Sequence, residues 1–186
     1  REPILLVGHC AGLDPVGDWA EDQPWDALRE VLRALWEGPP SAAFVDGPTS
    51  GGGVGLACAC DQVLATPEAS FALPELLLGL IPGAVGPAVR ARVGAGGLRR
   101  LAMGATAVAV DEALRMGLVD APARSEQAAL THLGRLDPDA VRALRHALWP
   151  TRLEDVDAGI AMSRARLATA APRLRRWALG ETPWST

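Results

Sequence analysis

The sequence predicts an α/β fold, and three observations carry this prediction. In the first half of the chain, short runs of apolar residues typical of buried strands alternate with segments of helical periodicity. A glycine-rich turn separates the second of these runs from a stretch of small apolar residues. The last third of the chain has a helical pattern throughout, with arginines interrupting the apolar faces.

Four strands are predicted from short apolar runs bounded by turn-forming residues. The first is expected to be buried on both faces, because it is apolar and branched without alternation, and Gly8 closes it. The segment between the second and third strands contains a turn-rich, glycine-rich loop over residues 46–53. The predicted strands are residues 4–7, 42–45, 61–65 and 70–73.

The predicted helices begin with residues 25–35, whose leucines recur at helical spacing and which Gly38-Pro39-Pro40 ends. Residues 53–60 are small and apolar, as a central helix packed on all sides would be. Asp111 is the expected N-cap of a later helix. The remaining predicted helices are 85–93, 96–103, 110–116, 125–134, 138–148 and 152–179.

The chain is expected to divide into a core, residues 1–120, and a C-terminal helical region, residues 121–186. Ile160, Leu167 and Leu174 form an apolar stripe with a spacing of seven residues on the last helix. This stripe packs either against the body of the same subunit or against another copy, and the pattern leaves both open.

Composition excludes several classes of function. The 186 residues carry a net charge of −4, and the basic residues are scattered, which argues against nucleic-acid binding. The sequence contains no lysine, which excludes a P-loop and a Schiff-base lysine. We predict a cytoplasmic protein, because no apolar run reaches the length of a membrane span and no signal peptide opens the chain. Since the chain starts at Arg1 without a methionine, we expect an upstream segment.

The three cysteines do not indicate a metal site or a disulfide framework. Cys58 and Cys60 have C-x-C spacing, and Cys10 lies far away in the sequence. We expect them to be small buried residues of a reduced protein, and we predict no metal.

The glycine-rich run Ser50-Gly51-Gly52-Gly53 precedes the predicted central helix. A helix N-terminus offers N–H donors and a favourable dipole to an oxygen that gains negative charge, and glycines let a ligand approach the backbone closely. Such loops also bind phosphates, but the dinucleotide and P-loop patterns are absent. The run therefore needs its context to be interpreted.

That context resembles the signature region of the crotonase superfamily, the enoyl-CoA hydratases and isomerases. The resemblance is carried by Asp46-Gly-Pro-Thr-Ser-Gly-Gly-Gly-Val-Gly-Leu-Ala-Cys-Ala-Cys-Asp61, Leu73-Pro74-Glu75 and Leu78-Gly79-Leu80-Ile81-Pro82-Gly83. It implies a spiral of ββα units with a C-terminal helical trimerisation region, hence a homotrimer or hexamer. It also implies an acyl-CoA or acyl-carrier-protein thioester as substrate, with no separate cofactor.

The resemblance also assigns roles to residues. The oxyanion hole would be formed by the N–H groups of Ala11 and Gly52, with further substrate contacts from Gly51, Gly53, Leu13 and Pro82. Hydratases of the family have two glutamates, and here Gly55 stands at the first position and Glu75 at the second. The resemblance therefore favours isomerisation over hydration, with decarboxylation and dehydration as related possibilities.

Glu75 lies in an apolar stretch, which should raise its pKa and suit it to proton transfer, although a structural glutamate at a strand end is the plainer interpretation. His9 precedes the predicted oxyanion loop and is a second candidate base. Asp14 and Asp61 are expected to be turn or cap residues.

Three other functions remain as alternatives. The missing first glutamate is compatible with an accessory subunit of a polyketide-type synthase that has lost catalysis. A serine hydrolase using Ser50 lacks the G-x-S-x-G motif. A protease of the related Clp fold would need a serine where Gly51–Gly53 stand.

Overall fold

The computed structural model describes residues 2–10, 23–148 and 153–182. Its strands are β1 (Ile4–Val7), β2 (Ser41–Val45), β3 (Pro48–Ser50), β4 (Gln62–Ala65), β5 (Ser70–Ala72), β6 (Val108–Ala109) and β7 (Ala121–Pro122). Its helices are α1 (Gln23–Glu37), α2 (Gly52–Ala59), the 3₁₀ helix η1 (Glu75–Leu78), α3 (Gly86–Gly104), α4 (Val110–Arg115), α5 (Glu126–Leu133), α6 (Pro138–Leu148) and α7 (Leu153–Ala178). Over these ranges no helix is long and apolar enough to cross a membrane.

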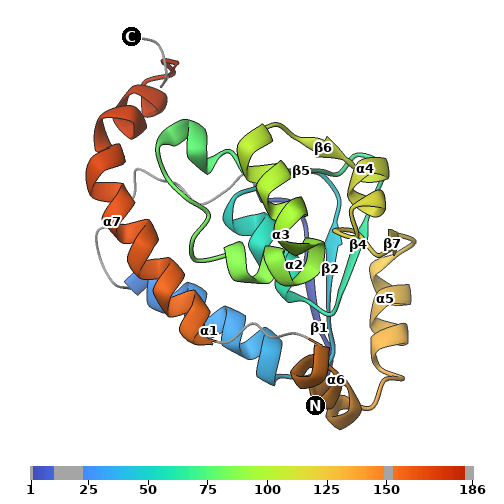
Figure 1. The fold of residues 1–186 in the computed structure, drawn as a ribbon. Helices are drawn as coiled ribbons and strands as arrows, with labels where there is room; N and C mark the ends of the chain where they lie inside the picture. The colour runs from blue at the N-terminus through green and yellow to red at the C-terminus, as the bar shows by residue number, and fades with distance from the viewer. Residues whose placement is uncertain (1, 11–22, 149–152, 183–186) are drawn as a thin grey trace.

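Two small sheets form the centre of the molecule (Figure 1). The larger has the strand order β1-β2-β4-β7, and all its pairs are parallel. In the smaller, β3 runs parallel to β5 and β5 runs antiparallel to β6. Helices connect the parallel strands, as such crossovers require. The predicted α/β class and the four predicted strands are therefore confirmed.

The prediction that the first strand is buried on both faces is wrong. β1 is an edge strand whose only described neighbour in the sheet is β2, and its residues are partly exposed. Val7 at its end retains 51% exposure. The apolar run indicated a strand correctly, but an uninterrupted apolar pattern does not determine how many neighbours a short strand has.

Helix α2 lies at the centre of the apolar core, as its small residues predict. Six of its eight residues are buried, among them Val54 and Cys58. Small side chains let it contact α1, α3 and the strands β2, β3 and β4. The helix begins after Gly51, whose φ of 55° lies in the region that favours glycine.

One detail of the predicted helices is confirmed and one is wrong. The predicted break between residues 85–93 and 96–103 is present as a kink within α3, where Gly94 has the non-helical angles φ 70° and ψ 174°. Asp111 is not an N-cap: Ala109 holds that position, and Asp111 lies in the first turn of α4. There its carboxylate still interacts favourably with the helix dipole.

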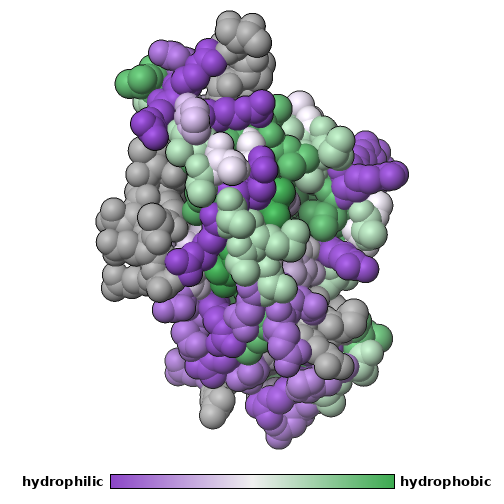
Figure 2. Space-filling model, turned by 60° about the vertical axis from the view of Figure 1, so that its left-hand side comes forward, coloured by the Kyte–Doolittle hydropathy of each residue, from purple (hydrophilic) through white to green (hydrophobic). Residues whose placement is uncertain are grey.

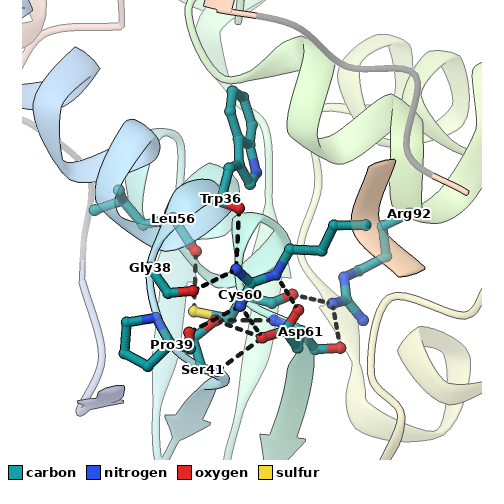
Figure 3. A network of polar contacts seen from close by, with 9 residues as sticks. Trp36, Gly38, Pro39, Ser41, Leu56, Cys60, Asp61 and Arg92 are labelled. Carbon is teal, nitrogen blue, oxygen red and sulfur yellow. Dashed lines mark hydrogen bonds and ion pairs between the residues drawn. The ribbon is translucent and has the colours of Figure 1, made fainter. Parts of the chain in front are cut away.

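Arg145 of α6 connects three parts of the fold. Its partners Trp36, Gly38, Pro39 and Asp61 are labelled in Figure 3. Its guanidinium binds Asp61 through Nε at 2.7 Å and Nη2 at 2.5 Å. It also donates to the carbonyls of Trp36, in the last turn of α1, and of Gly38 and Pro39, which follow that helix. Asp61 accepts in addition from Ser41 N–H at 2.7 Å. The predicted turn residue Asp61 is thus one half of a nearly buried ion pair.

Helix α7 runs along one side of the molecule, where it contacts α1, α3 and η1 (Figure 1). Ile160 and Leu167 pack against the core and Leu174 is buried, so this stripe faces the body of its own chain. On the side that carries α7, apolar residues gather in the upper part of the surface and polar residues dominate the lower part (Figure 2). Oligomerisation stays a prediction.

Candidate functional site

A cavity of about 150 Å³ lies between the N-terminus of α2, η1, α1 and α7. It brings together four residues that the sequence singled out: Gly51, Gly52, Glu75 and Pro82. Its other lining residues are Trp25, Leu28, Ser50, Pro74, Leu78, Leu80, Ile81, Gly83, Ala84, Val85, Ser163, Leu167 and Trp177. Glu75 is the one ionisable side chain among all these described lining residues.

Glu75 is the first residue of η1, directly after Pro74. Within the described part of the chain, its Oε2 atom is buried and has no hydrogen-bond partner. Burial raises the pKa of the Glu75 carboxyl to about 7, outweighing the opposing hydrogen bond from its own backbone. At neutral pH this group can therefore both accept and release a proton, as proton transfer requires.

The glycine loop places a helix N-terminus at the cavity. Gly51 donates its N–H to Ala72 O at 2.9 Å, which anchors the loop to the smaller sheet. Gly52 is the first residue of α2, and N–H groups in a first turn have no partner within the helix. The Gly52 N–H is therefore available at the cavity lining for an oxygen that gains negative charge.

Gly53 does not line the cavity. Because it has no side chain, Cys10 can approach the glycine loop closely at this position. A side chain on Gly53 would lie 2.7 Å from Cys10 Cβ and 3.0 Å from Thr49 Cγ2. Cys10 O also accepts a hydrogen bond from Ser50 N–H at 2.8 Å. Residue 10 is thus held against the glycine loop. Ala11 and Leu13, predicted for the oxyanion hole and for substrate contact, lie outside the described residues, as does Asp14.

The segment from Gly79 to Gly83, which includes Pro82, is held by α7. Arg166 donates to Gly79 O through Nη2 at 2.9 Å and Nε at 3.1 Å. At Gly83 this segment and α7 lie so close together that a side chain would be 2.7 Å from Ser163 Oγ. Helix α7 therefore holds both ends of this segment, Gly79 and Gly83. Gly79 also ends the 3₁₀ helix that Glu75 begins.

The structure does not bring His9 into the cavity lining. Its Nδ1 pairs with Asp46 Oδ1 at 3.1 Å, and both side chains are exposed. The ring packs against Gly47, where a side chain would lie 3.0 Å from His9 Cγ. His9 therefore has a structural partner on the surface, and its proposed catalytic role stays a prediction.

Cys58 and Cys60 are buried, as expected, whereas Cys10 is only partly buried; all three are free cysteines. Burial raises the pKa of the Cys58 and Cys60 thiols to about 12, so neither is a thiolate at neutral pH. Among the residues whose structure is described, no three His, Cys, Asp or Glu side chains are grouped as metal ligands would be.

Sequence reasoning missed the walls that α1 and α7 contribute. Trp25 and Leu28 come from α1, and Ser163, Leu167 and Trp177 come from α7. Leu167 belongs to the apolar stripe of α7, whose pattern left open whether it packs against the same subunit or against another copy. Nothing in the local sequence distinguishes Trp177 from a surface residue, because its position depends on how α7 crosses the fold.

Comparisons with known proteins identify the family of the chain. The sequence profile of the family described as enoyl-CoA hydratase/isomerase matches residues 10–154. A 2,3-dehydroadipyl-CoA hydratase of Escherichia coli is 31% identical over 167 residues, which are 83% of this chain and 65% of that protein. The bacillaene synthase dehydratase PksH of Bacillus subtilis is 31% identical over 147 residues, 78% of this chain and 56% of that protein.

A solved structure is also similar: a putative enoyl-CoA hydratase from Mycobacterium avium paratuberculosis has a TM-score of 0.73 at 28% identity, covering 90% of this chain and 72% of that one. The chain spans less than two thirds of the length of either curated relative. The matched profile nevertheless covers most of the chain, including the glycine loop and Glu75. The chain belongs to the enoyl-CoA hydratase/isomerase family, within the crotonase superfamily.

Proposed function

We propose that the chain is an enzyme that moves a proton between two carbons of an acyl thioester, with Glu75 as the proton shuttle. Double-bond isomerisation is the favoured reaction. One observation carries the proposal: Glu75 Oε2 is buried without a described partner in a cavity that also contains the N-terminus of α2. A buried acceptor without a partner costs folding energy, which is expected where a substrate supplies the missing partner.

The mechanism follows from these groups. Glu75, as carboxylate, removes the proton next to the thioester carbonyl, and negative charge develops on the carbonyl oxygen. The N–H of Gly52, with that of Ala11 as the predicted second donor, stabilises this charge. Glu75 then returns the proton two carbons further along, and the double bond moves into conjugation with the carbonyl. No water is consumed, so one carboxylate is sufficient.

The cavity supports an uncharged, apolar acyl group. Leu78, Leu80, Ile81 and Leu167 line it, and no arginine or histidine is among its described lining residues. A second carboxylate on the acyl chain would therefore lose its hydration without gaining a counter-charge. The carrier, coenzyme A or acyl carrier protein, is proposed from the family. Similarity to PksH supports a place in polyketide or other secondary metabolism.

The test follows a β,γ-unsaturated hexenoyl-CoA by the ultraviolet absorbance of its conjugated product and by deuterium uptake from D₂O. Glu75→Gln removes the base and should lower both rates at least ~100-fold. Glu68→Gln is the matched control, because Glu68 is exposed in the turn after β4, and it should retain wild-type rates. Rates within tenfold of wild type for Glu75→Gln would exclude Glu75 as the shuttle.

The second candidate function is that of an accessory subunit of a biosynthetic synthase. The presence of a single acidic residue in the described cavity lining favours it, since hydratases of the family resemble one another in having two. This function predicts no deuterium uptake with any acyl thioester and a stable complex with a synthase on gel filtration. Isomerisation by the purified chain alone would argue against it.

A further inference from the structure

Gly55 of α2 faces Val85, the residue before α3, with no space between them. A side chain on Gly55 would lie 2.9 Å from Val85 Cγ2, and closer still to Val85 Cβ and Cγ1. Carbon atoms in contact normally lie about 3.5–4.0 Å apart. Gly55 does not have a positive φ, so its backbone would accept any residue. The contact with Val85 is therefore sufficient to require glycine at this position.

Val85 also lines the cavity that contains Glu75. It is 4% exposed and is fixed in place by the hydrogen bond from Val89 N–H to its carbonyl at 3.2 Å. Gly55 itself is buried and does not line the cavity. Val85 therefore lies between Gly55 and the cavity, on the path that a longer side chain at position 55 would take.

We propose that Val85 determines the reaction specificity of this site by excluding a second carboxylate. The inference rests on the proposed role of Glu75 and adds the reason why the site is restricted to proton transfer. Hydration breaks an O–H bond of water, forms a C–O bond at the β-carbon and delivers a proton to the α-carbon. Two carboxylates divide these tasks well. With Val85 in place, no side chain at position 55 can help to orient the water.

The contact makes a sharp prediction about two substitutions of Val85. Val85→Gly removes the three atoms nearest to a side chain at position 55. Val85→Ala keeps Cβ, which is the nearest of them, and is therefore the matched control. Both are compatible with the backbone, since Val85 has φ −102° and ψ −15° as the N-cap of α3, a position that glycine tolerates.

The activity experiment measures hydration of crotonyl-CoA by loss of its enoyl absorbance. The double variant Gly55→Glu/Val85→Gly should hydrate at least ~100-fold faster than wild type, because it gains a second acid–base group. Gly55→Glu alone and Gly55→Glu/Val85→Ala should stay near the wild-type rate. The inference is overturned if the Val85→Gly double variant folds and takes up deuterium from D₂O, yet hydrates no faster than wild type.

A double-mutant cycle of melting temperatures tests the clash between position 55 and Val85 without an activity assay. Gly55→Ala should lower the melting temperature of wild type by at least about 4 °C, because it overpacks the α2–α3 contact. The same change made in V85G should lower it by less than about 1 °C. Equal losses in both backgrounds would overturn the role of Val85. Absence of deuterium uptake by wild type would instead overturn the proposed function, which separates the two failures.

Discussion

Asp61 and Glu75 are two acidic residues that are largely shielded from water, but their carboxyl groups differ in the partners they have. Asp61 is the acceptor for the Arg145 guanidinium and for both the N–H and hydroxyl of Ser41 (Figure 3). Glu75 lies in a cavity lined mostly by apolar side chains, and its Oε2 has no described partner. One carboxylate is fully used in holding the structure, and the other is left for a ligand.

The difference shows that burial alone does not identify a functional carboxylate. A buried charge is tolerated when it is paired and hydrogen-bonded, as at Asp61, and such a pair holds secondary-structure elements together. A carboxyl without partners instead keeps its proton to higher pH, as the pKa of about 7 for Glu75 shows. Such a group destabilises the fold and is suited to proton transfer.

Arg145→Met should cause the largest loss of stability. The change removes the counter-charge of Asp61, which keeps only its hydrogen bonds from Ser41, and it removes the guanidinium donor from three backbone carbonyls. Removing one partner of a buried ion pair costs about 3–5 kcal/mol. Urea denaturation followed by circular dichroism measures this loss, and a loss below about 1 kcal/mol would show that the network is not structural.

Arg142→Met provides the matched control on the same helix. Arg142 pairs with Asp139 at 3.0 Å, three residues away, and both side chains are exposed. Exposed pairs of this kind contribute little. Unfolding by urea should therefore be nearly unchanged in this variant.

Glu75→Gln should stabilise the protein at high pH. The unfolded carboxyl has a pKa of 4.5 and the folded one about 7, so between these values the folded state alone holds the proton. Stability from this group is complete below pH 4.5, falls as pH rises towards 7 and stays low above it. The Gln variant does not lose stability in this way. Its free energy of unfolding should exceed that of wild type by up to about 3 kcal/mol above pH 7, and the difference should vanish near pH 4.5.

Urea denaturation at a series of pH values measures this effect, and Asp61→Asn sharpens the comparison. The Asn variant leaves the Arg145 guanidinium without its counter-charge and should therefore lose stability at neutral pH. Opposite signs for the two variants are expected. A common sign would mean that the environments of Asp61 and Glu75 do not differ in the way described.

Much of the fold followed from the sequence because local patterns were strong. The apolar runs located β1, β2 and β4, and the small residues of α2 indicated a helix packed on all sides. Gly52 and Glu75 were predicted for the site through the resemblance to the family, and local chemistry supported both: a helix N-terminus and an acid in an apolar stretch. Position 55 was also identified from the sequence as lacking its glutamate, although the reason for glycine there was not visible.

The rest depended on tertiary contacts. β6 and β7 have two residues each, too few for a periodicity, and they are strands only because β5 and β4 lie beside them. The contact between Gly55 and Val85 joins residues thirty positions apart, and Trp177 reaches the cavity only through the path of α7. Such juxtapositions are set by packing between helices and not by any local preference.

Arg166 is a structural arginine like Arg145, but it contacts the segment that follows Glu75 in the cavity. Arg166→Met removes two donors from Gly79 O and should cost about 1 kcal/mol, less than Arg145→Met because Arg166 is exposed. Since Gly79 ends the 3₁₀ helix of Glu75, we expect kcat for isomerisation to fall about 3- to 10-fold with KM nearly unchanged. Arg175→Met, an exposed change on the same helix, is the control. An equal fall in both variants would show that the contact of Arg166 with Gly79 does not position Glu75.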